Sequence, residues 1–553
     1  MRRRSRALVA VACLLCGAHG AAATTPQSRP TVAALIARLA AGAGGDQVTA
    51  TLVSYGRPAV PALLAALSNS SPLAQPRPLG GDLRSAIVTV LRQIPDPGVD
   101  DDLVAALADR DAGVRRFAAR ALGLRAGHAP ALLPLLHDPD AAVRIAAAEA
   151  IRWTRDRSVG AALAAALQDS VVEVRAQAAL GLAALDGAGQ CPALVTALHD
   201  APPRFVQPAA LAVARGACRD AVPELRESLR AGTEEVVAWA AWALVALHDT
   251  SAAGLLLARA QRGEQRARVA AIVGLGDLGE STAAAGLAGL LDDTDAAVRC
   301  AALWSLARLR APTTLPQVTA RLHDPNPLVQ RRAVLTLSTL TGGNADAAAS
   351  ATPSGTPTPR PPLQRRLLVI GDSISAGASY VDELSQHLGL IAVRNVSLHG
   401  TTTHDWRPDS TARGSLLWSA TQPPLATALD ETAMPNVVQP GTLAIVALGT
   451  NDILTAVTPA EYTLNLVTII DALLAHGIVP VLPLLPTPVG MTAPYTAAIR
   501  GLWQAYPQII AGPDVESSFQ QRSGLLSDLL HPNAAGYHVM ATAWIDALQP
   551  RLP

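Results

Sequence analysis

A serine, an aspartate and a histidine in the second half of the chain have the functional groups that nucleophilic hydrolysis requires. Ser373 follows the apolar run 367–370, and its hydroxyl can attack a carbonyl carbon once a base removes the proton. His531 can act as that base. Asp528, three residues earlier, can hold the imidazole in the required tautomer. These residues therefore point to acyl transfer through a serine nucleophile.

The oxyanion formed by this attack needs fixed hydrogen-bond donors. The backbone amides of Ser373 and Gly400 and the side-chain amide of Asn451 can supply them. Taken singly, each residue also has an ordinary structural explanation, such as a turn glycine, an asparagine cap or a surface pair of aspartate and histidine. The segments around Ser373, Gly400, Asn451 and His531 occur together and in this order, which favours a hydrolytic site.

The elements that must position these residues follow from the apolar pattern after residue 365. Short apolar runs alternate with segments long enough for helices, which predicts a parallel sheet covered on both faces. In such sheets, ligands bind beyond the carboxyl ends of the strands where the winding reverses, often between the first and third strands. Ser373 follows the first expected strand and Asn451 follows the third, so both should reach one crevice. The expected strands are 367–370, 391–397, 442–448, 478–485 and 508–511, and the expected helices are 380–388, 459–476, 492–506 and 534–548.

Together these segments resemble the four blocks of the SGNH, or GDSL-type, hydrolase family. The matching segments are Gly371 to Ile374, Gly400, Gly449 to Asp452, and the pair Asp528 and His531. The resemblance covers residues 363–553 and implies an α/β/α three-layer, flavodoxin-like domain that needs no metal or cofactor. It implies Ser373 as nucleophile, His531 as base, Asp528 as its orienting partner, and Ser373, Gly400 and Asn451 as oxyanion donors. Ile374 replaces the usual leucine with similar volume, and the lack of a Gly-x-Ser-x-Gly sequence around Ser373 disfavours the ordinary α/β-hydrolase fold.

The first half of the chain repeats one phrase, in which a valine and an arginine precede small and apolar residues at helical spacing. Successive copies lie 29 to 32 residues apart, as from Val114 to Val143 and from Val174 to Val206. Each copy predicts a helical hairpin, because a second apolar helix follows the first after a break. Stacked hairpins bury the apolar faces that one hairpin cannot bury alone. The copies centre on Leu83, Val114, Val143, Val174, Val206, Val237, Val269, Val298 and Val329.

These units resemble HEAT-like repeats, which implies an all-α solenoid over residues 30–341 with an extended surface for a protein or polymer partner. Two explanations of its recurrent arginines stay open: a basic stripe that binds a partner, and a structural ladder paired with nearby aspartates, which is favoured. Trp239 and Trp242 are expected in the core or along a groove rather than in a dedicated ligand cage. The arginines in question are Arg115, Arg144, Arg175 and Arg299.

Composition and the N-terminus restrict the possible partners and compartments. The 553 residues include 44 basic and 44 acidic side chains, and zero net charge gives nucleic-acid binding no electrostatic support. Residues 1–23 predict a secretory signal peptide, and no later run reaches the roughly 18 apolar residues of a spanning helix. We therefore expect a periplasmic or secreted protein. Lipoprotein anchoring at Cys13 or Cys16 is an alternative, although the residues before each cysteine fit it poorly.

Three cysteines remain after the signal peptide, namely Cys191, Cys218 and Cys300. Cys191 and Cys218 form either a disulfide between neighbouring repeats or isolated buried thiols, and the spacing of the three does not resemble a zinc site. Residues 342–362 are rich in proline, threonine and serine, which predicts an extended linker between two independent domains.

The sequence therefore predicts an exported serine esterase. Short acyl groups such as O-acetyl are favoured because the domain has no large lid insertion. Lysophospholipid or thioester cleavage is an alternative reaction. A different alternative is a scaffold protein whose repeats bind a partner and whose hydrolase domain is vestigial. Intact Ser373, Asn451 and His531 favour the enzyme.

Overall fold

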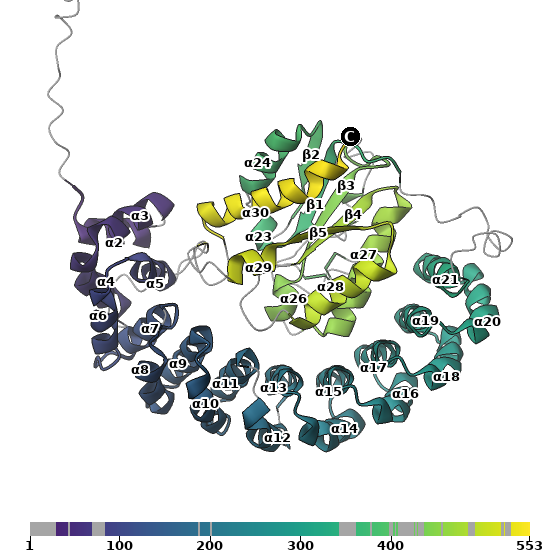
Figure 1. Ribbon diagram of the computed structural model, residues 1–553, viewed down its shortest axis with the longest axis horizontal. Helices are drawn as coiled ribbons and strands as arrows, with labels where there is room; N and C mark the ends of the chain where they lie inside the picture. Colours follow the sequence, from purple (N-terminus) through teal and green to yellow (C-terminus); the bar gives the residue numbers. More distant parts are fainter. Residues whose placement is uncertain are drawn as a thin grey trace, which may run out of the picture.

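The structure is a computed structural model in which the N-terminal part forms a solenoid and the C-terminal part an α/β domain (Figure 1). It describes residues 29–41, 45–68, 83–125, 127–185, 188–199, 202–341, 361–376, 379–397, 402–403, 405–406, 425, 428–429, 436–454, 457–484, 493–520, 525 and 532–553. The predicted signal peptide and most of the predicted linker lie outside these residues.

The solenoid consists of two rows of helices that follow one arc (Figure 1). The inner row contains α3 Gly45–Tyr55, α5 Leu83–Gln93, α7 Ala112–Gly123, α9 Ala141–Thr154, α11 Val172–Ala184, α13 Pro203–Arg215, α15 Glu234–Ala246, α17 Gln265–Leu278, α19 Ala296–Leu309 and α21 Pro327–Leu340. The outer row contains α2 Val32–Ala40, α4 Val60–Leu67, α6 Gly98–Ala106, α8 Ala129–Leu132, α10 Gly160–Ala166, α12 Cys191–His199, α14 Val222–Ala231, α16 Ala253–Gln261, α18 Ala284–Gly289 and α20 Leu315–Ala320.

Some aspartates cap the N-termini of inner helices, and other aspartates form ion pairs with the recurrent arginines. The Asp140 carboxylate accepts hydrogen bonds from the N–H groups of Ala142 and Val143, which caps α9. Arg144 of that helix forms an ion pair with Asp169 at 2.8 Å, just before α11. Arg115 and Asp138 repeat this pair at 2.8 Å, and Arg299 and Asp324 at 2.7 Å. Arg175 donates to the carbonyl oxygen of Asp169 at 2.7 Å, as Arg144 donates to that of Asp138 at 2.8 Å. The structural explanation of the ladder is confirmed.

Small residues let the inner helices approach closely, and one disulfide joins two repeats. A Cβ atom on Gly123 of α7 would lie only 2.6 Å from the Cβ of Ala150 on α9, so no side chain fits there.

Cys191 and Cys218 form a disulfide with Cα atoms 5.3 Å apart, which answers the question that the sequence left open. Trp239 is fully buried in the solenoid core, as expected.

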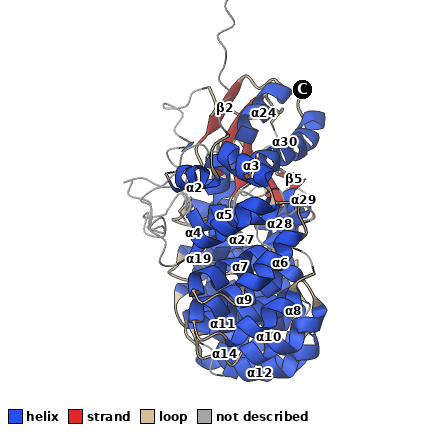
Figure 2. Ribbon diagram, turned by 90° about the vertical axis from the view of Figure 1, so that its left-hand side faces the viewer, coloured by secondary structure: helices blue, strands red, loops and turns tan. Residues whose placement is uncertain are grey.

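The C-terminal domain contains one parallel sheet in the order β2-β1-β3-β4-β5. Helices α24 and α30 pack against one face, and α27 and α28 against the other, so the predicted three-layer fold is confirmed. Figure 2 shows the strands confined to this domain. The strands are β1 Arg366–Gly371, β2 Ala392–Asn395, β3 Leu443–Ala447, β4 Val479–Leu484 and β5 Ile510–Asp514. The helices are α23 Ser373–Ala376, α24 Ser379–Leu388, α26 Thr450–Leu454, α27 Pro459–Ala475, α28 Ala493–Ala505, α29 Val515–Gln520 and α30 Ala534–Leu548.

The two domains are packed against each other, which differs from the predicted independence. The inner row of the solenoid faces the C-terminal domain (Figure 1), and α15, α17 and α21 contact α27. Arg332 of α21 lies 2.7 Å from the Asp471 carboxylate of α27, and both residues are 3% exposed. A proline-rich connection carries no information about such contacts, since they depend on side chains more than 100 residues apart.

Among the described helices, none is by itself both long and apolar enough to cross a membrane. By length and composition alone, the bent pair Gln47–Tyr55 and Arg57–Leu67 would qualify if its two arms were counted together.

Candidate active site

The segment after β1 is built around a short helix that starts at Ser373. Asp372 is 1% exposed, and its carboxylate accepts a hydrogen bond from the N–H of Ile374 at 3.0 Å. This capping bond turns the chain from the strand directly into α23. A Cβ atom on Gly371 would lie 2.7 Å from the Cβ of Ser375, so only glycine fits at the end of the strand. The sequence Gly371-Asp372 therefore places Ser373 at the carboxyl edge of the sheet.

The segment after β3 is built in a similar way. Gly449 has φ of 139°, a conformation that side chains disfavour, and it leads into α26. Asn451 is half-buried in the first turn of this helix. The Tyr462 hydroxyl donates to the carbonyl oxygen of Leu448 at 2.9 Å, which fixes the end of the strand from α27.

The sheet register brings these two segments together. Gly371 at the end of β1 pairs with Ala447 at the end of β3. Ser373 lies two residues beyond the first position, and Asn451 lies four residues beyond the second. The strand order reverses between β1 and β3, which is where open parallel sheets bind ligands. The backbone of Ser373 and the helix that carries Asn451 thus lie at the predicted crevice.

Asp452 ends one of the segments that resemble the family, but sequence reasoning assigned it no role. Its side chain is fully buried, and both carboxylate oxygens accept from the Thr403 N–H, at 3.1 and 3.0 Å. The Thr403 hydroxyl also donates to Asp452, and the Asn465 amide donates to that hydroxyl at 3.1 Å. Asp452 therefore ties the segment that follows Gly400 to the helix that carries Asn451. The signals in the sequence were its position next to Asn451 and its place in the segment Gly449 to Asp452.

The remaining predicted site residues lie outside the described part of the chain. Gly400, Asp528 and His531 belong to this group, and of Ser373 only the backbone is described. Asn533 follows His531 by two residues and caps α30, accepting from the Gly536 N–H at 2.9 Å. The roles of these residues stay predictions. Among the described residues, no group of three histidine, cysteine, aspartate or glutamate side chains is arranged to hold a metal ion.

Burial of Asp452 leads to a prediction about pH. Burial raises the pKa of Asp452 to about 7, because the Thr403 hydrogen bonds only partly offset the loss of water and because Glu461 and Asp372 carry like charge. The folded protein therefore binds this proton more tightly than the unfolded chain does. The resulting stability is fully present below about pH 4 and is lost as the pH rises to about 7. Relative to Asp452→Asn, the wild type should lose up to about 4 kcal/mol of unfolding free energy across this range, measured by urea unfolding.

Asp138→Asn is the matched control for this experiment. Burial opposes ionisation of Asp138, but Arg115 and the Asp140 N–H outweigh it, so the pKa of Asp138 is lowered. Its contribution to stability is present at neutral pH and is lost as the pH falls through the folded-state pKa. As the pH rises, the unfolding free energy of the wild type should therefore fall relative to that of Asp452→Asn and rise relative to that of Asp138→Asn. A flat or rising difference for Asp452→Asn would contradict the prediction.

The fold defines the class of the C-terminal part, an α/β/α domain with a parallel sheet that follows a helical-repeat solenoid. Residues 369–539 match the model of the GDSL-like lipase/acylhydrolase family. Residues 129–215, 253–338 and 284–354 match the model of HEAT repeats. The chain thus carries a GDSL-like lipase/acylhydrolase domain preceded by HEAT repeats, as predicted. This match supports a hydrolase that acts on esters.

Among curated proteins, no sequence matches this chain. Similar solved structures include the CpcE and CpcF complex of phycocyanin lyase from Nostoc sp. PCC7120, at 20% identity over 44% of this chain and 94% of that one, with a TM-score of 0.26. A putative lipolytic protein of the G-D-S-L family from Desulfitobacterium hafniense DCB-2 is 16% identical over 34% of this chain and 100% of that one, with a TM-score of 0.26. Human deoxyhypusine hydroxylase is 22% identical over 45% of this chain and 95% of that one, with a TM-score of 0.21. TM-scores this low carry no argument about function.

Proposed function

We propose that the protein is an exported serine esterase that hydrolyses carboxylic esters through an acyl-serine intermediate. The observation that carries this proposal is the pairing of Gly371 with Ala447, which sets the Ser373 backbone beside the helix of Asn451 at the switch point of the sheet. The family match over residues 369–539 supports the same reaction.

In the proposed mechanism, His531 accepts the hydroxyl proton of Ser373 as the serine oxygen attacks the acyl carbonyl. Asp528 orients the imidazole. The Asn451 amide and the backbone amides of Ser373 and Gly400 stabilise the oxyanion. His531 then donates its proton to the leaving alcohol, and water releases the acid from the serine in a second cycle. Asp452 contributes by fixing the segment after Gly400 to α26 through Thr403.

The location and the substrate are further parts of the proposal. A disulfide between Cys191 and Cys218 suits an oxidising compartment, which supports export by the signal peptide of residues 1–23. Short acyl or O-acetyl esters are favoured over lysophospholipids and thioesters. A protein or polymer partner, if one binds the repeats, has to use surface that the C-terminal domain leaves uncovered, because that domain contacts α15, α17 and α21 of the inner row.

Hydrolysis of p-nitrophenyl acetate, butyrate and palmitate by the purified protein tests the proposal. A fluorophosphonate, which forms a phosphorus–oxygen bond to an activated serine and releases fluoride, should label the peptide that contains Ser373 and stop hydrolysis. Faster turnover of the acetate than of the palmitate supports the short-acyl preference. Absence of both hydrolysis and labelling would favour the scaffold alternative.

A further inference from the structure

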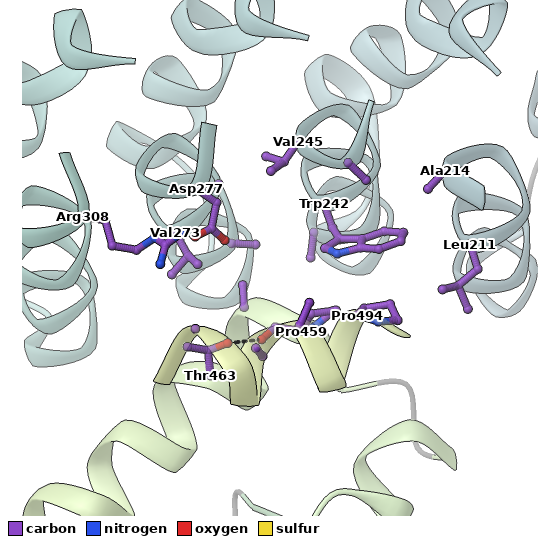
Figure 3. A pocket seen from close by; sticks show the side chains of 18 of the residues that line it. Leu211, Ala214, Trp242, Val245, Val273, Asp277, Arg308, Pro459, Thr463 and Pro494 are labelled. Atoms are coloured by element: carbon purple, nitrogen blue, oxygen red, sulfur yellow. Dashed lines mark hydrogen bonds and ion pairs between the residues drawn. The ribbon is translucent and has the colours of Figure 1, made fainter. Parts of the chain in front are cut away.

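A cavity of about 440 Å³ lies between the solenoid and the C-terminal domain. Its solenoid wall comes from α13, α15, α17 and α19, and its other wall from the N-terminal halves of α27 and α28 (Figure 3). Binding sites for small molecules commonly have this volume and commonly form between domains. We call it the interdomain cavity.

Small side chains on both walls keep the interdomain cavity open. The facing positions include Ala238 and Gly274 on the solenoid and Ala498 and Gly501 on α28. A Cβ atom on Gly501 would come no closer than 3.8 Å to its nearest neighbour, the Nη1 atom of Arg308, so a methyl group would fit there without a clash. Close-packed protein interiors leave few voids larger than a water molecule, so an opening of this size is not a feature of ordinary packing.

The middle of the interdomain cavity is apolar and aromatic. Trp242 is only partly buried, and its indole ring lies toward Pro459 and Pro494 across the cavity (Figure 3). Its neighbour Trp239 is fully buried in the solenoid core. A partly exposed tryptophan that faces an apolar wall can pack against the flat or aliphatic body of a ligand.

Charged side chains line the edges of the cavity with an excess of positive charge. Arg308 places Nε 2.8 Å from the carboxylate of Asp277, and these side chains are 34% and 40% exposed. Since Nη1 of Arg308 lies beside Gly501, the guanidinium borders the cavity as well as the carboxylate. Arg215 lines the cavity too, so the lining includes two arginines and one aspartate, and each of these side chains also has a partner within the protein. The two cationic side chains of the lining favour an anionic ligand group over a cationic one.

We propose that the interdomain cavity binds an amphipathic organic anion, with its apolar body on Trp242 and its anionic group at Arg308. A ligand that contacts both walls binds the docked arrangement of the domains and therefore stabilises it by mass action. This inference does not depend on the esterase activity of Ser373.

The dye 8-anilinonaphthalene-1-sulfonate, an aromatic anion that fluoresces when it leaves water, is the probe for the full-length protein. Ala497 lines the cavity from α28, so Ala497→Phe should fill it and weaken dye binding at least 10-fold. Ala497→Ser, which adds only a hydroxyl, should change the affinity less than 2-fold. Ala498→Phe fills the same space from a different position, and circular dichroism and thermal unfolding verify that each variant is folded.

Arg308→Gln tests the anionic contact separately. It should weaken binding of the sulfonate dye about 5- to 10-fold, while the neutral dye N-phenyl-1-naphthylamine changes less than 2-fold. Saturating dye should also raise the melting temperature of the wild type and leave that of Ala497→Phe unchanged. The proposal is overturned if the wild type does not bind the dye, or if both phenylalanine variants bind it like the wild type. Equal losses of both dyes in Arg308→Gln would overturn the choice of an anion.

Discussion

Ser373→Ala is expected to lower kcat/KM for p-nitrophenyl acetate by at least about 10³-fold. Alanine cannot form the acyl intermediate, so the reaction would have to proceed by direct attack of water. The oxyanion donors and the binding site would remain, which is why a residual rate above that of the uncatalysed reaction is also expected. The measurement is steady-state hydrolysis at substrate concentrations below KM, with fluorophosphonate labelling of the same preparations.

Ser375→Ala is the control that the same helix offers. Ser375 is fully buried, and its hydroxyl lies 3.1 Å from that of Tyr380. Its replacement removes one buried hydrogen bond and should change kcat/KM less than about 10-fold. Equal rates for Ser373→Ala and the wild type would exclude the esterase and leave the scaffold alternative. A large loss with Ser375→Ala alone would show that the wrong serine had been assigned.

Much of the fold could be predicted because its determinants are local. Strand β1 was expected from a continuous apolar run, and helix α30 from a segment long enough for a helix after the last expected strand. The repeats were predictable for a related reason, since the Asp140 cap recurs at Asp111 and Asp295, and the pair of Arg144 and Asp169 recurs at Arg115 and Arg299. A pattern that repeats along the chain reveals contacts that a single copy would hide.

The candidate site was predictable only where it follows strand ends. Ser373 and Asn451 come directly after β1 and β3, so the topology of a parallel sheet is enough to bring their segments together. The tie between Asp452 and Thr403 joins residues 49 positions apart in sequence, and neither residue differs from an ordinary polar loop residue. Gly400, Asp528 and His531 lie outside the described residues and remain predictions.

The contacts between the domains were not predictable, since Arg332 and Asp471 have no distinctive sequence around them. In the structure, Arg332 donates to Asp471 and to the Tyr506 hydroxyl, and that hydroxyl donates to Asp471 at 3.1 Å. Burial disfavours the charge on Arg332, but Asp471 and Tyr506 outweigh it, so the pKa of Arg332 is raised. The guanidinium therefore stays charged inside the interface. Removal of one partner of this buried ion pair should lower the free energy of unfolding.

Arg332→Met is expected to lower the free energy of unfolding by about 3–5 kcal/mol, because it leaves the Asp471 carboxylate buried without its cation. Asp471→Leu should lower the free energy of unfolding by a similar amount, since it leaves the Arg332 guanidinium buried without its carboxylate. The double variant Arg332→Met/Asp471→Leu should recover most of the loss, because a buried ion pair and an apolar pair of similar volume differ little in stability. Urea unfolding of the four proteins gives the coupling energy of this cycle.

Arg230→Met is the matched control, because Arg230 pairs with Glu227 at 3.3 Å on the surface, where both side chains are more than half exposed. Its loss should cost less than about 1 kcal/mol. Small-angle scattering adds a readout of domain docking: if Arg332→Met separates the domains, the radius of gyration rises while the helix content stays constant. Additive effects in the cycle would mean that Arg332 and Asp471 do not stabilise each other. The solenoid would then be held to the hydrolase domain by apolar contacts and by other polar contacts, such as the ion pair of Arg266 with Glu461 at 2.8 Å. The predicted independence of the two domains would be closer to the truth than their buried ion pair indicates.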